Sequence, residues 1–367
     1  MHVVVCGGGA IGCSIAYFLT RRGAGVTVVE STGIACAASG KSGGFLARDW
    51  CAGTPLDPLA RRSFDLHAEL AAEISDDWGY RRLDTYGGFA SRRVSLGEYR
   101  SAYALDWFAP DVALCQSIGS RETTAQVHPA RYTEAMMNAA EARGAELKRG
   151  RMIGLRRDGD RVAGVEIEGG DTIAADVVVI AMGPWSVLAA RWLPLPPVFG
   201  LKGHSLVFDT GDRVPAEAAF LEYQEETGAV LTPELFPRPD GTTYVCGISG
   251  EEIVPIDPAR VKPDGGAIYR LEAMCRALSP VLAAAPIVAR QACYRPVTGD
   301  GLPLIGKAPG VGGAYIATGH SVWGILNAPA TGEAMAELIV DGAARTVDLA
   351  PFDPERLRPL DPSRLRI

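Results

Sequence analysis

Short apolar runs and stretches of helical periodicity alternate along the first thirty residues. The apolar run 2–6 is followed by several glycines, by apolar residues at helical spacing over 11–19, and by a second apolar run over 26–29. Because both runs are apolar at nearly every position, they predict strands that are buried on both faces of a parallel sheet. The pattern is typical of a strand, helix, strand unit.

The pattern changes after residue 30 and returns near residue 175. The spacing of apolar residues predicts a helix over 58–74 and then a strand over 86–90 that belongs to a different sheet. It also predicts a helix over 130–143 that ends at Gly144, and a strand near 175–180 that rejoins the first sheet. Prolines at 194, 196 and 197 mark a crossing into a region of alternating strands and turns that extends to about 287. The segment from Pro351 onward is expected to be an extended surface tail.

These alternations predict an α/β protein with a discontinuous Rossmann-like domain. That nucleotide-binding domain is assembled from residues 1–84, 126–197 and 288–367. A smaller substrate domain, built on a mixed or antiparallel sheet, comprises residues 85–125 and 198–287.

Composition narrows the classes of partner. The chain has 367 residues, 47% of them hydrophobic, and a formal net charge of −7, which disfavours nucleic acid and anionic membrane surfaces. No apolar run approaches the ~20 residues that span a bilayer, and the N-terminus lacks the pattern of a secretory signal. Eight cysteines without a C-x-x-C pair indicate neither a metal site nor a redox dithiol. We therefore expect a cytoplasmic protein without membrane insertion; its oligomeric state stays open.

The first glycines form a dinucleotide-binding pattern. Gly7, Gly9 and Gly12 match G-x-G-x-x-G between a strand and a helix, where exposed N–H groups and the helix dipole favour a pyrophosphate. Glu30 ends the second strand and is placed to accept hydrogen bonds from a ribose, which favours FAD or NAD over NADP. The alternative is that the glycines only form a tight turn and that Glu30 is a solvated carboxylate.

Four further stretches distinguish FAD from NAD. They are Ala38 to Phe45, Val127 to Pro129, Ala181 to Ser186, and the pair formed by Arg295 to Gly306 and Ala317 to Ile325. Together with the first glycines they resemble the D-amino acid oxidase, glycine oxidase and sarcosine oxidase superfamily of flavoenzymes. The resemblance spans nearly the whole chain and implies FAD, with these binding residues: Gly7, Gly9, Ala10, Ile11, Gly12, Glu30, Ser31, Ser39, Lys41, Ser42, Gly43, Gly44, Gly183, Trp185, Cys293, Gly319, His320, Val322, Trp323, Gly324 and Ile325.

The last of these stretches leads into a helix. Gly319 and Gly324 indicate a flexible turn, and Asn327 with Pro329 predicts the start of a helix that runs to about Asp341. A helix start facing the flavin would stabilise the negative charge that develops on the reduced ring.

Candidate catalytic residues follow from the resemblance. Arg295 lies where amino acid oxidases of the superfamily carry an arginine that binds the substrate carboxylate; the alternative is an ion pair with a carboxylate such as Asp300. His204 could orient the substrate or act as a structural hydrogen-bonding group. Glu234 occupies the usual position of a substrate-lining tyrosine, which is a departure from glycine oxidase. His320 is a candidate base.

Two further positions bear on the flavin chemistry. The spacing of Cys293 resembles that of the cysteine joined covalently to FAD in monomeric sarcosine oxidases; the alternative is a small, inert thiol. Thr243 aligns with a lysine that promotes reaction with oxygen in those enzymes, so both O2 and a quinone are kept as electron acceptors.

The function that these residues favour is FAD-dependent oxidation of an amine or amino acid. The substrate would be a D-amino acid, glycine or an N-methyl amino acid that loses a hydride from its α carbon to flavin N5 and forms an imine that hydrolyses. Two alternatives remain open. One is a dehydrogenase of 2-hydroxy acids or polyol phosphates, which needs His204 or His320 as a base. The other is a flavin-bearing interaction protein without turnover.

Overall fold

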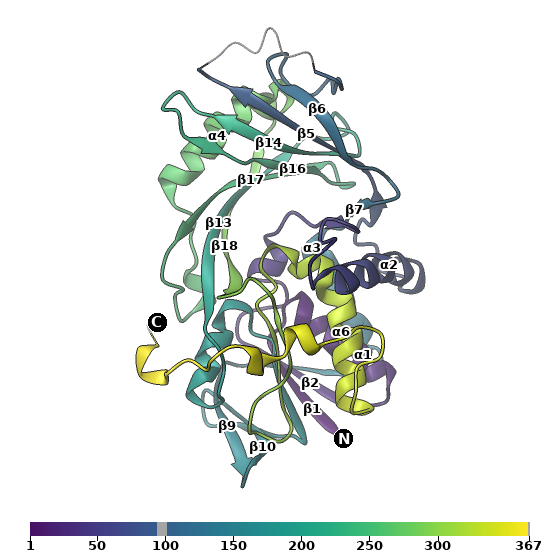
Figure 1. Cartoon of the computed structure of the whole chain (residues 1–367), viewed down its shortest axis with the longest axis vertical. Coiled ribbons are helices and arrows are strands. Elements are labelled where there is room, and N and C mark those ends of the chain that lie inside the picture. The colour runs from purple at the N-terminus through teal and green to yellow at the C-terminus, as the bar shows by residue number, and fades with distance from the viewer. Residues whose placement is uncertain (94–100, 366–367) are drawn as a thin grey trace.

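The computed structural model describes residues 1–93 and 101–365. A lower part with a parallel sheet between helices carries an upper part built on a large curved sheet, and two long strands connect them (Figure 1). No helix within the described residues is both long enough and apolar enough to cross a membrane.

The lower sheet contains the two apolar runs at the N-terminus. Its order is β19-β20-β12-β1-β2-β8, with all pairs parallel except β19 with β20. The central residues Val3, Val4 and Val5 are fully buried, as expected for a strand covered on both faces. The strands span His2–Cys6 (β1), Gly25–Glu30 (β2), Glu146–Arg149 (β8), Val177–Ile180 (β12), Leu304–Lys307 (β19) and Ala314–Thr318 (β20).

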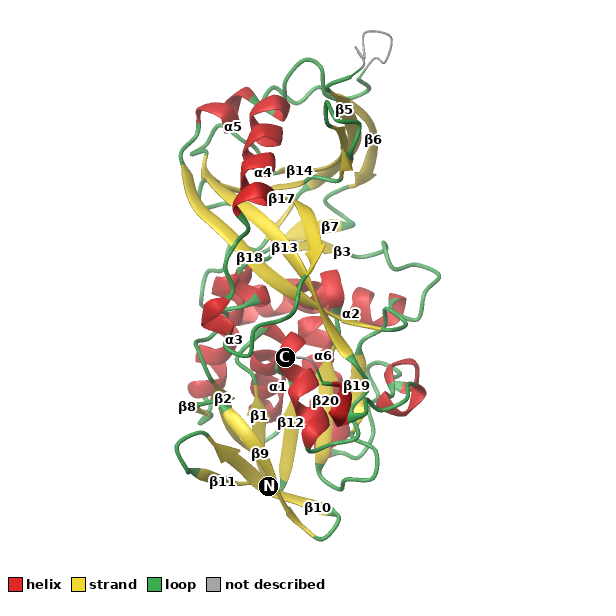
Figure 2. Ribbon diagram, turned by 90° about the vertical axis from the view of Figure 1, so that its left-hand side faces the viewer, coloured by secondary structure: helices red, strands yellow, loops and turns green. Residues whose placement is uncertain are grey.

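Four helices pack together beside this sheet, and Figure 2 shows α1 and α6 lying close to its strands. Gly332 of α6 lies directly against the backbone of α1: a Cβ at this position would lie 2.7 Å from the carbonyl carbon of Ser14. The absence of a side chain therefore lets the two helices pack in close contact. The helices are α1 (Ala10–Arg21), α2 (Asp57–Glu73), α3 (Pro129–Glu141) and α6 (Gly324–Val340), of which α2 packs against the outer side of α6.

The upper sheet has eight strands in the order β18-β13-β17-β16-β14-β5-β6, with β15 paired to β14. Its pairs are antiparallel except β14 with β5, so the expected mixed sheet is confirmed. Helices α4 (Gly265–Leu278) and α5 (Pro280–Ala284) cover it. The strands span Asp84–Ser91 (β5), Ala113–Gly119 (β6), Val198–Asp209 (β13), Glu217–Gln224 (β14), Val230–Leu231 (β15), Glu234–Pro237 (β16), Thr242–Glu251 (β17) and Ile287–Thr298 (β18).

Two small three-stranded sheets complete the fold. One lies between the two parts and contains β3 (Phe45–Ala47), β7 (Thr124–Gln126) and β4 (Arg81–Arg82). The other lies at the base and contains β9 (Met152–Asp158), β10 (Arg161–Ile167) and β11 (Thr172–Ala174).

The predicted domain limits stay a prediction. The limit at residue 288 falls at the start of β18, which pairs along its length with β13 of the predicted substrate domain. The prediction of an extended surface tail is wrong in part. Phe352 is fully buried, and the guanidinium of Arg356 lies 2.7 Å from the carboxylate of Asp300. An aromatic ring and an ion pair therefore fix the tail to the lower part.

Candidate active site

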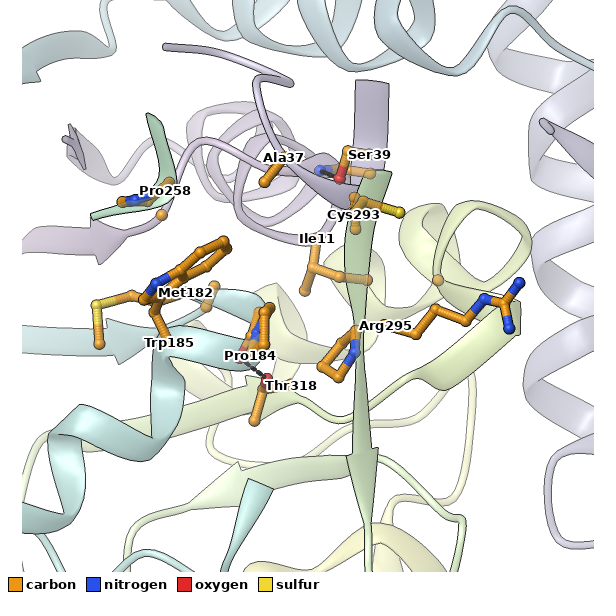
Figure 3. A pocket seen from close by; sticks show the side chains of 18 of the residues that line it. Ile11, Ala37, Ser39, Met182, Pro184, Trp185, Pro258, Cys293, Arg295 and Thr318 are labelled. Carbon is orange, nitrogen blue, oxygen red and sulfur yellow. Dashed lines mark hydrogen bonds between the residues drawn. The ribbon is translucent and has the colours of Figure 1, made fainter. Parts of the chain in front are cut away.

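A cavity of about 1590 Å³, part of it open to solvent, extends from the first glycines to the inner face of the upper sheet. Figure 3 shows Ile11 and Ser39 from the N-terminal segment, Trp185 from the segment after β12, and Cys293 and Arg295 on β18. The cavity has room for an extended ligand and lies between the two parts of the molecule.

The lower end of the cavity is formed by the turn before α1. Gly7 has φ +118° and lies so close to the next strand that a Cβ would be 2.3 Å from the carbonyl oxygen of Ala181, while a Cβ on Gly12 would be 2.0 Å from the carbonyl oxygen of Gly7. The Gly8 N–H donates to Glu30 Oε2 (2.8 Å) and the Ala10 N–H donates to Ser39 Oγ (2.9 Å). Only glycine permits this tight packing of strand, turn and helix.

The start of α6 forms another part of the wall. The helix begins at Gly324, so the prediction of a start at Asn327 is wrong, and Pro329 lies inside the helix. A proline there removes one N–H donor and leaves a carbonyl free. The structure compensates from α2: His67 Nε2 lies 3.0 Å from the carbonyl oxygen of Ile325 and 3.2 Å from that of Leu326.

A second side chain of α2 completes this compensation. The Ala330 N–H, which follows the proline, donates to Ser63 Oγ at 3.1 Å. The side chains of Ser63 and His67 thereby let α6 continue through its proline and begin one turn earlier, at the cavity.

Two helices thus begin at the cavity without a side-chain cap. The N-cap residues are Gly9 for α1 and Trp323 for α6, and neither makes a side-chain capping hydrogen bond. The first N–H groups of a helix carry partial positive charge and attract anionic groups. An elongated cavity with two such ends fits FAD, whose pyrophosphate would lie at α1 and whose isoalloxazine would lie near α6.

The upper end of the cavity contains an arginine that lies across the sheet. Arg295 and Cys293 of β18 share a face with Gly203 of β13, and a Cβ at Gly203 would be 3.4 Å from Arg295 Nη2. The guanidinium therefore lies over a strand that has no side chain in its way. Its Nη1 donates to Ser249 Oγ of β17 at 3.1 Å.

The alternative role for Arg295, an ion pair with Asp300, does not occur. Both carboxylate oxygens of Asp300 bind the guanidinium of Arg356, at 2.7 and 3.1 Å. Among the described residues, no carboxylate forms an ion pair with Arg295. Its guanidinium is left to face the cavity.

A carboxylate lies on the same side of the sheet. Glu234 of β16 pairs with Cys246 of β17, whose Sγ lies 3.5 Å from Glu234 Oε2. Burial raises the pKa of Glu234, and Arg295 opposes this shift. Burial also raises the pKa values of the Cys246 thiol and of the nearby Tyr244 phenol, so both groups are neutral at pH 7.

His204 is buried in the cavity wall. Its Nε2 accepts a hydrogen bond from the Asp264 N–H at 3.1 Å, and burial lowers its pKa. These contacts fit the structural alternative, and a role in orienting the substrate stays a prediction. Thr243 is likewise buried, and its hydroxyl lies 2.8 Å from that of Thr210.

His320 lines the cavity from below and is buried. Its Nε2 lies 3.1 Å from Thr331 Oγ1, and burial lowers its pKa to about 3, which makes it a weak base. The next residue, Ser321, has φ +50°, a conformation that costs a non-glycine residue free energy and is found most often at functional sites. This turn leads directly into the start of α6.

Most of the predicted cofactor residues are brought together. In the cavity wall lie Gly7, Gly9, Ala10, Ile11, Glu30, Ser31, Ser39, Ser42, Gly43, Gly183, Trp185, Cys293, His320, Val322, Gly324 and Ile325. Gly12, Lys41, Gly44, Gly319 and Trp323 are not part of that wall. Gly12 packs against Gly7, and Trp323 packs against the lower core, so their contribution is to the shape of the site.

Sequence reasoning missed the wall residues contributed by other strands. Tyr244, Cys246 and Gly203 face the cavity from the upper sheet, and Arg151 and Met152 face it from the segment before β9. The alternation of residues 242–246 indicates a strand with two distinct faces. Which face borders the cavity depends on the pairing of β17 with β13 and β16, which the sequence of that segment does not specify.

Comparisons with known proteins agree with this geometry. Residues 2–338 match the family model of the DAO FAD-dependent oxidoreductases. The chain is 30% identical to the oxidoreductase C1F5.03c of Schizosaccharomyces pombe, whose name gives no substrate, over 96% of this chain and 98% of that protein. It is 29% identical to a glycine oxidase of Pseudomonas aeruginosa, over 96% of this chain and 98% of that protein.

A solved structure gives the same result. The glycine oxidase of Geobacillus kaustophilus superimposes with a TM-score of 0.80 at 26% identity, over 96% of this chain and 97% of that one. The glycine turn, the two uncapped helix starts and the match over nearly all of the sequence lead to one conclusion. This chain belongs to the DAO family of FAD-dependent oxidoreductases, and FAD is its cofactor.

Proposed function

We propose that this protein oxidises an amino acid whose carboxylate is bound by Arg295, with a D-amino acid, glycine or an N-methyl amino acid as substrate. The observation that carries the proposal is the Arg295 guanidinium, which faces the cavity and donates to Ser249 Oγ while Asp300 is bound by Arg356. A planar guanidinium binds both oxygens of a carboxylate and stays charged at any working pH.

FAD, when bound, accepts the hydride that leaves the carbon beside the substrate nitrogen. The residues of this chain bind the substrate and the cofactor and orient them. Arg295 fixes the carboxylate end, so the α carbon and its nitrogen lie between the upper sheet and the flavin ring. The start of α6, at Gly324 and Ile325 in the cavity wall, would face the charge that develops on the reduced ring. Water then hydrolyses the imine product.

A dehydrogenase of 2-hydroxy acids finds less support. Removing a hydroxyl proton requires a positioned base, and neither histidine suits this task. His204 Nε2 already accepts a hydrogen bond from the Asp264 N–H, and burial lowers the pKa of His320 to about 3. An interaction protein without turnover also finds less support, because the cavity is continuous from the glycine turn to Arg295.

Anaerobic mixing tests the proposal. The holoenzyme is mixed with D-amino acids, glycine, sarcosine and, as the alternative class, 2-hydroxy acids, while the flavin absorbance near 450 nm is followed. We expect at least one amino acid to bleach the flavin. Bleaching by hydroxy acids alone, or by no compound that carries an amino group, would refute the proposal. Reoxidation of the reduced protein by O2 and by a soluble quinone then identifies the electron acceptor.

A further inference from the structure

Glu234 places a carboxylate in a cavity that already contains the cationic Arg295. Glu234 belongs to β16 and reaches the cavity wall beside Cys246, its strand neighbour on β17. The only hydrogen bond described for its carboxylate comes from the Cys246 thiol, at 3.5 Å, which is a weak donor at a long distance. Its capacity to accept hydrogen bonds is therefore mostly unused.

The two charged groups approach the same strand from opposite sides. Glu234 is tied to Cys246, whereas Arg295 crosses β13 over Gly203 and binds Ser249, three residues farther along β17. A β-bulge lies between these positions, and their partners on β13, Ser205 and Gly203, are two residues apart, which is roughly 7 Å along the strand. No nitrogen of Arg295 forms an ion pair with Glu234 among the described contacts. The charges border one space without neutralising each other directly.

The other polar groups of this wall carry no charge at pH 7. Tyr244 and Cys246 on β17 and Cys293 on β18 have their pKa values raised by burial, so they stay protonated. His204 also borders the cavity, and burial lowers the pKa of its imidazole, so it is neutral at pH 7. Lys41 interacts with Cys293 from the glycine loop but is not part of the wall. A ligand in this space therefore meets one cationic group and one acidic group.

A substrate that carries only a carboxylate would satisfy Arg295 and leave the acidic group unpaired. A substrate that also carries an amino group satisfies both, because its ammonium form donates to the carboxylate. The ammonium form predominates in water at pH 7, but its nitrogen has no lone pair with which to assist departure of a hydride from the adjacent carbon. One proton must leave the nitrogen first.

We propose, on the basis of the function inferred above, that Glu234 selects substrates with an amino group and accepts one proton from their ammonium form. The N–H bond breaks, the proton joins a carboxylate oxygen of Glu234, and the electron pair stays on nitrogen. Glu234 is then a neutral acid, and no oxidant or reductant takes part in this step. The raised pKa of Glu234 makes it a better proton acceptor than an exposed carboxylate.

The binding test uses probes that cannot be oxidised. 2-Aminoisobutyrate is an amino acid without an α hydrogen, and 2-hydroxyisobutyrate replaces its amino group by a hydroxyl. Their binding to the holoenzyme is measured from the shift of the visible flavin spectrum between pH 6 and 9. The variant Glu234→Gln keeps the shape but loses the charge. Glu222→Gln is the matched control, because it removes an exposed carboxylate from the neighbouring strand β14.

We expect the wild type and Glu222→Gln to bind the amino acid at least 10-fold more tightly than the hydroxy acid. Glu234→Gln should lose this preference and bind the hydroxy acid within twofold of the wild type. The proposal is overturned if Glu234→Gln retains the preference, if it weakens both probes equally, or if the wild type prefers the hydroxy acid or binds neither.

A pH profile separates proton transfer from simple binding. With the amino acid that bleaches the flavin fastest, Glu234→Gln should reduce flavin at least 10-fold more slowly at pH 7 and recover toward the wild-type rate near pH 10, where the free amine predominates. A rate defect that is the same at every pH contradicts the proton-accepting role. If no amino acid bleaches the wild type, the proposed function fails, while the binding test still decides whether Glu234 recognises an amino group.

Discussion

Arg295 lies across the upper sheet over a glycine and reaches Ser249. A Cβ at Gly203 would lie in van der Waals contact with the guanidinium, at 3.4 Å from Nη2, so a side chain longer than that of alanine would compete with the arginine for this space. The chemistry of one residue therefore depends on the size of another on a neighbouring strand. This arrangement fixes a planar, permanently charged fork at the wall of the cavity.

Replacing the Arg295 guanidinium should weaken binding of the substrate carboxylate strongly. Arg295→Gln removes the charge and the paired donors, and we expect KM for the best amino acid substrate to rise about 100-fold, which corresponds to about 2.7 kcal/mol. Arg295→Lys keeps a charge without the fork and should show a smaller increase. Flavin content and thermal stability of both variants control for folding. An unchanged KM in Arg295→Gln would exclude Arg295 as the carboxylate ligand.

Cys293 lies in the cavity wall, where a covalent bond to FAD is one of two possibilities raised by the sequence. Burial raises the pKa of its thiol, which disfavours the thiolate that forms such a bond. We expect trichloroacetic acid precipitation to release all flavin into the supernatant, as judged by its absorbance. Yellow colour that stays with the denatured protein and disappears in Cys293→Ala would show the covalent link instead.

At the scale of elements, α2 determines where α6 begins. The proline inside α6 would end a helix in isolation, yet His67 and Ser63 bond to the backbone groups that the proline leaves without helical partners. The uncapped end of α6 consequently lies at the cavity. His67 contacts neither substrate nor flavin in this arrangement, so it is a positioning residue.

A double-mutant cycle tests this relationship. His67→Phe leaves two buried carbonyls without their donor and should lower the free energy of unfolding by about 2 kcal/mol. In a Pro329→Ala background an N–H at residue 329 can bond to the Ile325 carbonyl, so the same substitution should cost less. Urea unfolding measures the stability, and the affinity of the apoprotein for FAD reports on the helix start. Equal costs in both backgrounds would show that His67 and Pro329 are not coupled.

Across the whole molecule, buried histidines determine how stability depends on pH. Burial lowers the pKa values of His67 and His128 to about 4 and that of His320 to about 3, and it also lowers that of His204, whereas these groups lie near 6.5 in the unfolded chain. Above pH 6.5 neither state binds these protons and the histidines leave the stability unchanged. Below pH 6.5 the unfolded state binds more protons, so the folded state loses stability as the pH falls toward 4.

The expected slope follows from the number of histidines. Each contributes about 1.4 kcal/mol per pH unit once the unfolded form is fully protonated and the folded form is not. Urea unfolding of the holoenzyme at pH 7, 6 and 5 measures this slope. In His67→Phe one proton fewer is taken up on unfolding, so the dependence should be shallower. A slope that does not change in this variant would show that His67 is not buried in its neutral form.

The two parts of the molecule are joined by aromatic packing as well as by β13 and β18. Phe45, which follows the glycine loop, stacks on Phe236 of the upper sheet with ring centroids 5.3 Å apart, and Phe220 lies 5.0 Å from Phe45. Gly43 runs so close to the sheet that a Cβ would lie 2.2 Å from the Phe236 ring. The glycine loop that borders the cofactor is therefore held against the substrate-binding face.

Local sequence determined much of this protein. Buried runs such as Val3 to Val5 can only be central strands, and Gly7 and Gly12 occupy places where any side chain would collide with backbone, so strand, turn and helix follow from residue type. The resemblance of the C-terminal stretches identified FAD and Arg295. Each of these patterns involves residues that lie close together in the sequence.

Tertiary structure decided what depends on partners distant in sequence. The start of α6 is set by His67, more than 250 residues away, and the availability of Arg295 follows from the pairing of Asp300 with Arg356 in the C-terminal tail. The register of β13 with β18 placed Gly203 beneath Arg295. Hydrogen bonds and strand faces depend on which segments meet in space, and that is determined only when the whole core packs.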